Sequence, residues 1–144
     1  MVFRALLLSK IEGQVLSLDT DVVVQWDLCK VFDFPFDVAL TRRHKPILDQ
    51  HGNDLTKTMP YNGGVFWSRD DEFRLAYHKF CDTHKATFGW FIDQVALAQV
   101  GPRFNLLTLD CDNFNYTPKS ATEDVSQRFA VHYKGERKRW MAIQ

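Results

Sequence analysis

The sequence predicts a single globular domain with an α/β fold, and three observations support this prediction. Short apolar segments typical of strands alternate with longer segments whose apolar residues recur at helical spacing. The chain of 144 residues fits one domain, residues 1–144, and is long enough to bury a core. Its composition, 45% hydrophobic and 25% charged, is that of an ordinary globular protein.

Each expected element follows from periodicity and from residues that start or stop helices. Gly13, Gly89 and Gly101-Pro102 are suited to end helices, whereas Asp27 and Ser68 are suited to cap them. The expected elements are, in order, a helix over residues 2–12, a strand over 14–18, a short helix after Asp27, a strand over 36–41, a long polar loop over 42–60, a strand over Val65–Trp67, helices over 69–82 and 92–100, a strand over 104–109 and a short strand over 129–132.

Charge and cysteine content exclude several classes of function. Lys plus Arg and Asp plus Glu both number 18, so the basic excess expected of a general nucleic-acid-binding protein is missing. The apolar run Ala5–Leu8 is far too short to span a bilayer. Three widely spaced cysteines argue against a disulfide framework. We therefore expect a cytoplasmic protein with buried, reduced thiols.

Asp19-Thr20-Asp21 is the strongest candidate for a metal site. The two carboxylates follow the apolar run Val15–Leu18, where unpaired charge is penalised. A divalent cation relieves that penalty, and open α/β sheets bind ligands at the carboxyl ends of their strands. The alternative is a strand that ends in a polar turn.

Other polar segments could complete such a site. His132 ends a predicted strand and opens a basic tail that includes Lys138 and Trp140. An imidazole, carboxylates and phosphate oxygens suit Mn²⁺, although a single His is more often structural, and most basic tails are simply solvated. Asn62-Gly63-Gly64 is either a tight turn or a place where a sugar or phosphate approaches the backbone. Asp93-Gln94 offers a carboxylate and an amide at a helix start, where an acidic group is also favoured by the helix dipole.

These segments, in this order, resemble the glycogenin-type retaining glycosyltransferases. The matching residues are Leu18-Asp19-Thr20-Asp21-Val22-Val23, Asn62-Gly63-Gly64-Val65, Asp93-Gln94, and His132 followed by Lys138 and Trp140. The resemblance implies a GT-A-like mixed sheet flanked by helices. It also implies transfer of a sugar, with retention, from a nucleoside-diphosphate sugar to an acceptor hydroxyl.

The resemblance implies a role for each matched residue. Asp19, Asp21 and His132 would bind Mn²⁺, or Mg²⁺ in its place, and Lys138 would contact the diphosphate. The donor sugar would lie beside Asn62, Gly63 and Gly64, with Asp93 and Gln94 at its reacting face and Trp140 in the closing segment. Asp93 would act as a nucleophile, or the leaving phosphate would guide a front-face attack.

Two departures from that family lead to further expectations. The family reads Lys-Pro-Trp where this chain has Lys138-Arg139-Trp140. The family also places several βα units, which hold the nucleoside base, ahead of its D-x-D motif. The chain is therefore expected to be an incomplete or short form of the domain, or to obtain that part from a second chain or a homo-oligomer.

Two other classes of function stay open from the sequence. A haloacid-dehalogenase-like phosphotransferase also carries Asp-x-Asp after an apolar strand, and it would need Asp110 and Asp112 as its later acidic pair. A truncated domain that binds metal or sugar nucleotide without turnover is the non-enzymatic alternative.

Overall fold

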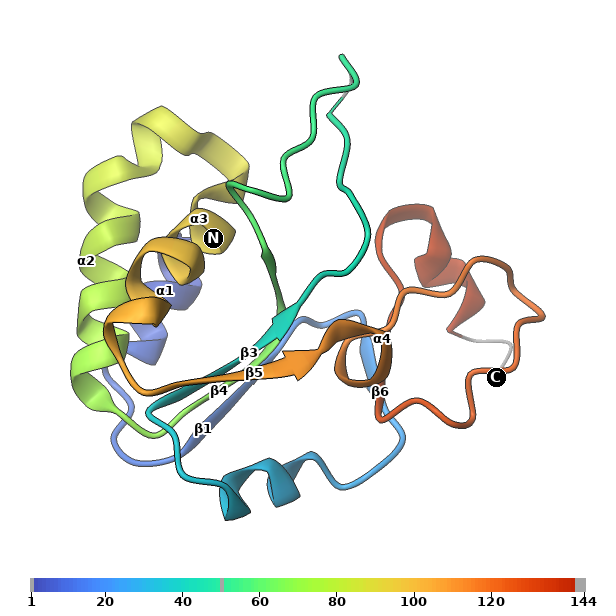
Figure 1. Cartoon of the computed structure of the whole chain (residues 1–144), viewed down its shortest axis with the longest axis horizontal. Coiled ribbons are helices and arrows are strands. Elements are labelled where there is room, and N and C mark those ends of the chain that lie inside the picture. The colour runs from blue at the N-terminus through green and yellow to red at the C-terminus, as the bar shows by residue number, and fades with distance from the viewer. Residues whose placement is uncertain (1, 50, 142–144) are drawn as a thin grey trace.

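The computed structural model describes residues 2–49 and 51–141 and confirms a mixed α/β architecture with a sheet flanked by helices (Figure 1). The main sheet has the strand order β1-β4-β3-β5. Its strands are β1 (Val15–Leu18), β3 (Val38–Arg42), β4 (Tyr61–Ser68) and β5 (Leu106–Asp110). β4 runs antiparallel to both of its neighbours, whereas β3 and β5 are parallel.

Three helices cover one face of this sheet (Figure 1). They are α1 (Val2–Leu8), α2 (Asp71–Phe88) and α3 (Ile92–Val100). Leu40 and Phe66 of the sheet pack against Tyr77 of α2 and Leu97 of α3 in the larger core. Side chains alternate along a strand, so Val65 and Trp67 point to the opposite face.

That opposite face is covered by short elements. They are η1 (Leu28–Asp33), a two-stranded antiparallel ribbon of β2 (Val22–Val24) and β6 (Ala130–His132), and α4 (Cys111–Phe114). Trp67 is fully buried here, and its indole N–H donates to the carbonyl oxygen of Leu28 at 2.9 Å. Coverage on both sides explains why all eight residues of β4 are buried.

The remaining described helices are short 3₁₀ helices: η2 (Gly89–Phe91), η3 (Gly101–Arg103) and η4 (Gly135–Trp140). η4 closes the C-terminal segment, where Trp140 packs beside a small cluster of Tyr116, Val125, Val131 and Tyr133. No helix in the described part of the chain is both long enough and apolar enough to cross a bilayer.

Several predicted boundaries were wrong. The first helix ends at Leu8 rather than at residue 12. α2 begins at Asp71, because its N-cap is Asp70 rather than Ser68, and it continues as far as Phe88, where Gly89 is the C-cap. The Asp70 carboxylate accepts from the backbone N–H of Phe73 at 2.6 Å. The helix over 92–100 was predicted with its observed bounds. β2 was not predicted, because only its pairing with β6 makes it a strand.

Asn62-Gly63-Gly64 lies inside β4 and is not a turn. Neither glycine has positive φ, so the tight turn given above as one alternative for this segment was wrong. The cysteine prediction also needs correction. All three thiols are free, but Cys29 is exposed and Cys111 is partly exposed, whereas Cys81 is buried.

Candidate functional site

The candidate site lies at the edge of the sheet where β1, β3 and β5 end and β4 begins. The register pairs Leu18 with Val65, and Arg42 with both Tyr61 and Asp110. Residues just beyond these ends therefore share one edge. The backbone N–H of Asp19 continues the ladder by donating to the carbonyl oxygen of Gly64 at 2.8 Å.

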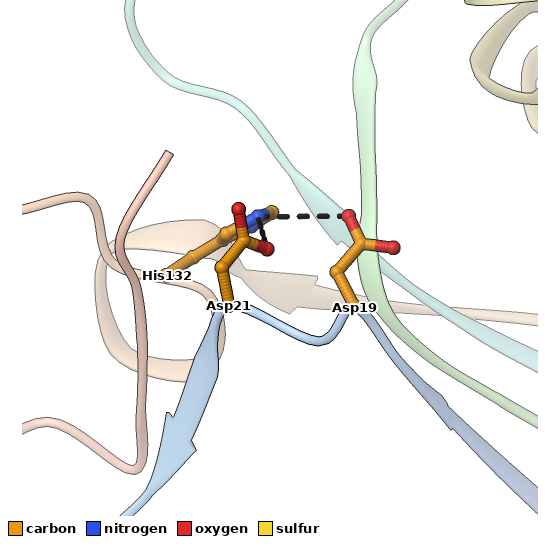
Figure 2. A group of neighbouring side chains, drawn as sticks. All are labelled: Asp19, Asp21 and His132. Carbon is orange, nitrogen blue, oxygen red and sulfur yellow. Dashed lines mark ion pairs between the residues drawn. The ribbon is translucent and has the colours of Figure 1, made fainter. Parts of the chain in front are cut away.

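Asp19, Asp21 and His132 meet at this edge (Figure 2). The two carboxylates flank the short connection from β1 to β2, and the imidazole reaches them from the end of β6. His132 Nε2 lies 3.0 Å from Asp21 Oδ1 and 3.5 Å from Asp19 Oδ2. One ligand atom from each residue falls within 4.8 Å of the others, a spacing that a single cation can bridge.

Hydrogen bonds around Asn115 decide which nitrogen of His132 carries the proton. Asn115 Nδ2 donates to the carbonyl oxygen of Asn62 at 3.0 Å and to Thr41 Oγ1 at 2.9 Å. Its Oδ1 therefore faces His132 Nδ1 at 2.9 Å. A carbonyl oxygen only accepts, so Nδ1 is the protonated nitrogen and Nε2 presents a lone pair.

This arrangement fits a divalent cation. Burial lowers the pKa of His132 to about 4, so the imidazole is neutral near pH 7. A neutral Nε2 lone pair then faces two carboxylate oxygens, an arrangement of three acceptors without a donor between them. A hard or borderline cation with one nitrogen and two oxygen ligands turns this repulsion into attraction, and Mn²⁺ suits such a donor set.

Each carboxylate is also held by a cation outside the cluster. Asp19 Oδ1 accepts from Arg4 Nη1, and Asp21 Oδ2 lies 3.2 Å from Lys138 Nζ. Burial opposes the charged form of Asp21, yet the ammonium of Lys138 holds the pKa of its carboxyl below its ordinary value. These outer partners orient oxygens toward the cluster.

Gly64 makes room for the imidazole. A Cβ added there would lie 2.2 Å from His132 Cε1 and Nδ1, so no side chain fits unless the ring moves. A Cβ at Gly63 would point to the other face of β4, 3.3 Å from Arg4 Nη2 and 3.6 Å from Asp93 Oδ2. The space beside Gly64 is thus taken by protein, and a contact of either glycine with a sugar stays a prediction.

Asp93 lies at the start of α3 and is buried. Its Oδ2 accepts from Arg4 Nη2 at 2.8 Å, so Arg4 joins Asp19 to Asp93. Burial raises the pKa of Asp93, and Arg4 opposes that rise. The neighbouring Gln94 accepts through Oε1 from Arg43 Nη2. Arg43 also donates to the carbonyl oxygens of Met59 and Tyr61.

A cavity of about 500 Å³ opens over these groups and would accommodate a small polar ligand. Most of the predicted site residues line it: Asp19, Asp21, Asn62, Gly63, Gly64, Asp93, Gln94 and His132. Lys138 is more than half exposed and reaches the site only through Asp21. Trp140 packs against the C-terminal cluster and lies under Arg137, so its role in substrate binding stays a prediction.

Sequence reasoning missed Arg4, Arg43 and Asn115 and did not single out Lys134. Lys134 lines the cavity, and burial lowers the pKa of its ammonium to about 8. Of these four residues, only Arg43 carried a local signal for a role in the site, because it is a cation placed one residue after the end of a strand. Arg4 and Asn115 are far in sequence from the groups they hold.

Comparison with known proteins places the fold. No family model and no curated protein matches the chain. Among solved structures, a glycosyltransferase involved in the glycosylation of the major capsid of PBCV-1 superposes with a TM-score of 0.72 at 19% identity. The chain has a glycosyltransferase fold.

A second structure supports the same conclusion. The apo-form glycosyltransferase GlyE of Streptococcus pneumoniae TIGR4 superposes with a TM-score of 0.60 at 16% identity. Both alignments cover 99% of this chain, but only 75% of the PBCV-1 protein and 42% of GlyE. A quarter or more of each neighbour therefore has no counterpart in this chain.

We expect Asn115→Ala to weaken Mn²⁺ binding about 10-fold to 100-fold, because the variant removes the acceptor that fixes the His132 tautomer. Isothermal titration with MnCl₂ measures the change. Asn113→Ala is the control, since Asn113 lies two residues earlier and its side chain contacts Asp110 and Arg128 instead. Equal affinities of the two variants would contradict a positioning role for Asn115.

Proposed function

We propose that this chain is the catalytic part of a metal-dependent glycosyltransferase that moves a sugar from a nucleoside-diphosphate sugar to an acceptor hydroxyl. The observation that carries the proposal is the meeting of Asp19, Asp21 and the unprotonated Nε2 of His132 in the wall of the cavity of about 500 Å³. The fold of the chain is consistent with this activity.

In this proposal Asp19, Asp21 and His132 hold Mn²⁺, or Mg²⁺ in its place. The ion would supply positive charge to the diphosphate, whose negative charge grows as the glycosidic bond breaks. Lys138, beside Asp21, and Lys134, in the cavity wall, add further positive charge from the protein itself. Asn62 lines the same cavity and offers its amide to a sugar hydroxyl.

Asp93 and Gln94 are proposed to lie at the reacting face of the sugar. Transfer breaks the bond from the anomeric carbon to the diphosphate and forms a bond from that carbon to the acceptor oxygen. The acceptor proton moves to the leaving phosphate oxygen in a front-face reaction with retention. Because Asp93 is buried and paired with Arg4, we favour a positioning role for its carboxylate over attack as a nucleophile.

The test is hydrolysis of nucleoside-diphosphate sugars in the presence and absence of Mn²⁺. A panel that varies the base and the sugar is incubated with the protein, and the free nucleoside diphosphate is measured. We expect release that depends on Mn²⁺ and stops with EDTA. Binding of Mn²⁺ without turnover of any donor would instead indicate a domain that binds without catalysis.

The phosphotransferase alternative receives no support from the site. Asp110 pairs with His44 at 2.9 Å and caps α4, while Asp112 faces Lys45. Neither belongs to the cation-binding cluster found among the described residues. Release of phosphate from a generic phosphomonoester, lost in Asp19→Asn, would revive that alternative.

Lys138→Ala is expected to weaken binding of a nucleoside diphosphate about 10-fold while leaving the folded state intact. The lost interaction is a charge-assisted contact, and the side chain is more than half exposed, so little packing is removed. Titration calorimetry with UDP and with GDP, each with Mn²⁺, provides the measurement. Lys85→Ala, which removes an exposed lysine paired within α2, is the matched control.

A further inference from the structure

A second cavity, of about 670 Å³, lies next to the first. The two cavities share four lining residues, Arg43, Ile47, Asn62 and Lys134. None of the groups proposed to hold the cation, Asp19, Asp21 and His132, lines the second cavity. It lies instead beyond the carboxyl ends of β3 and β5 and is bordered by Cys111 of α4.

The second cavity has an excess of positive charge. Its lining cations are Arg43, Lys45, Lys134 and Arg137, and its one lining carboxylate among the described residues is Asp112. His44 and Lys45 face acidic partners, Asp110 at 2.9 Å and Asp112 at 4.0 Å. In the described part of the chain, no carboxylate lies within ion-pair distance of the other three cations.

Two of these three cations are already held in place. Arg43 donates to the carbonyl oxygen of Met59 at 2.9 Å, and Arg137 Nε donates to that of Pro118 at 2.8 Å. Burial lowers the pKa of Arg43 to about 10, although Cys111 and Asp93 oppose this shift. In the described residues no carboxylate lies close enough to Arg43 to act as a direct counter-charge. An anion in the cavity would supply it, and fixed donors lose little entropy on binding one.

We propose that the second cavity binds an oxyanion group, such as a phosphate or a carboxylate, carried by the sugar acceptor. This inference rests on the proposed function, since it assigns the first cavity to the donor. Because the two cavities adjoin at Arg43, Asn62 and Lys134, an acceptor bound in the second cavity would lie next to the donor sugar in the first. The proposal therefore restricts the chemical class of the acceptor to an anionic sugar or an anionic conjugate.

Inorganic phosphate is the probe for this cavity. It is titrated into the protein in buffer with EDTA, so that no metal or donor is needed, and ¹H–¹⁵N NMR spectra follow the amides. We expect the largest shifts at Thr117, Lys134 and Arg137. We further expect Arg137→Gln to weaken phosphate binding about 10-fold, as befits loss of a charge-assisted contact.

Arg139→Gln is the matched control, because Arg139 lies in the same turn, η4, but does not line the cavity. Equal weakening by the two variants would indicate general charge attraction and overturn the proposal. Weakening by Lys134→Gln but not by Arg137→Gln would place the anion in the first cavity and overturn it as well. If Arg137→Gln fails to fold, the shifts of the unmodified protein decide, and shifts confined to the first cavity count against the proposal.

Transfer assays separate this inference from the function on which it rests. Each active donor is offered with a sugar phosphate and with the same sugar unphosphorylated, and we expect Arg137→Gln to lower transfer to the phosphorylated acceptor alone. Donor hydrolysis without acceptor should be unchanged in that variant. Hydrolysis with no preference for the anionic acceptor would overturn the inference and leave the glycosyltransferase proposal standing. If phosphate binds at Arg137 but no donor is hydrolysed, the result would count against the proposed glycosyltransferase function and not against the anion site.

Discussion

Asp21→Ala is expected to reduce Mn²⁺ affinity by at least about 100-fold, because it removes a proposed ligand rather than an outer partner, whose loss alone typically costs 10-fold to 100-fold. It leaves Nε2 of His132 with only the more distant Asp19 oxygen, 3.5 Å away. It also frees Lys138, which pairs with Asp21. Isothermal titration with MnCl₂ gives the affinity directly.

Asp82→Ala is the matched control for this variant. Asp82 is an exposed carboxylate of α2 that pairs only with Lys85 in the described part of the chain, at 2.7 Å. It should bind Mn²⁺ as the unmodified protein does. Thermal melting without metal verifies that both variants are folded. A folded Asp21→Ala protein with an unchanged Mn²⁺ titration would refute the cation site.

Gly64→Ala is expected to destabilise the protein by about 1–3 kcal/mol, the usual cost of forcing extra atoms into a packed interior. The added Cβ would lie 2.2 Å from two atoms of the buried His132 ring. The ring must move, and with it the hydrogen bond from Nδ1 to Asn115. We therefore also expect a loss of Mn²⁺ affinity of about 10-fold or more.

Gly63→Ala separates this effect from a general intolerance of alanine in β4. Neither glycine has positive φ, so alanine suits the backbone at both positions. The nearest atom to a Cβ at Gly63 is the end of the flexible Arg4 side chain, at 3.3 Å. Urea unfolding should show a clearly smaller loss for Gly63→Ala. Equal losses, or normal Mn²⁺ binding by Gly64→Ala, would contradict this account of Gly64.

Local patterns were sufficient for part of the fold. The helix over 92–100 has its expected bounds, because its apolar spacing and the following Gly101-Pro102 act within a few residues. The strand over 15–18 that precedes Asp19 was likewise readable from a short apolar run. The tight turn that was one alternative for Asn62-Gly63-Gly64 is not observed, because burial between two layers overrides the local preference of Asn and Gly.

The sequence by itself determined that two carboxylates, spaced by one residue, end a buried strand, since this depends only on neighbouring residues. The tertiary structure alone decided that His132 faces them and that Asn115 sets its tautomer. It also decided that Arg4 connects Asp19 to Asp93. These contacts join segments far apart in the chain, so they exist only once the register of the sheets and the packing of α1 against α2 and α3 are established.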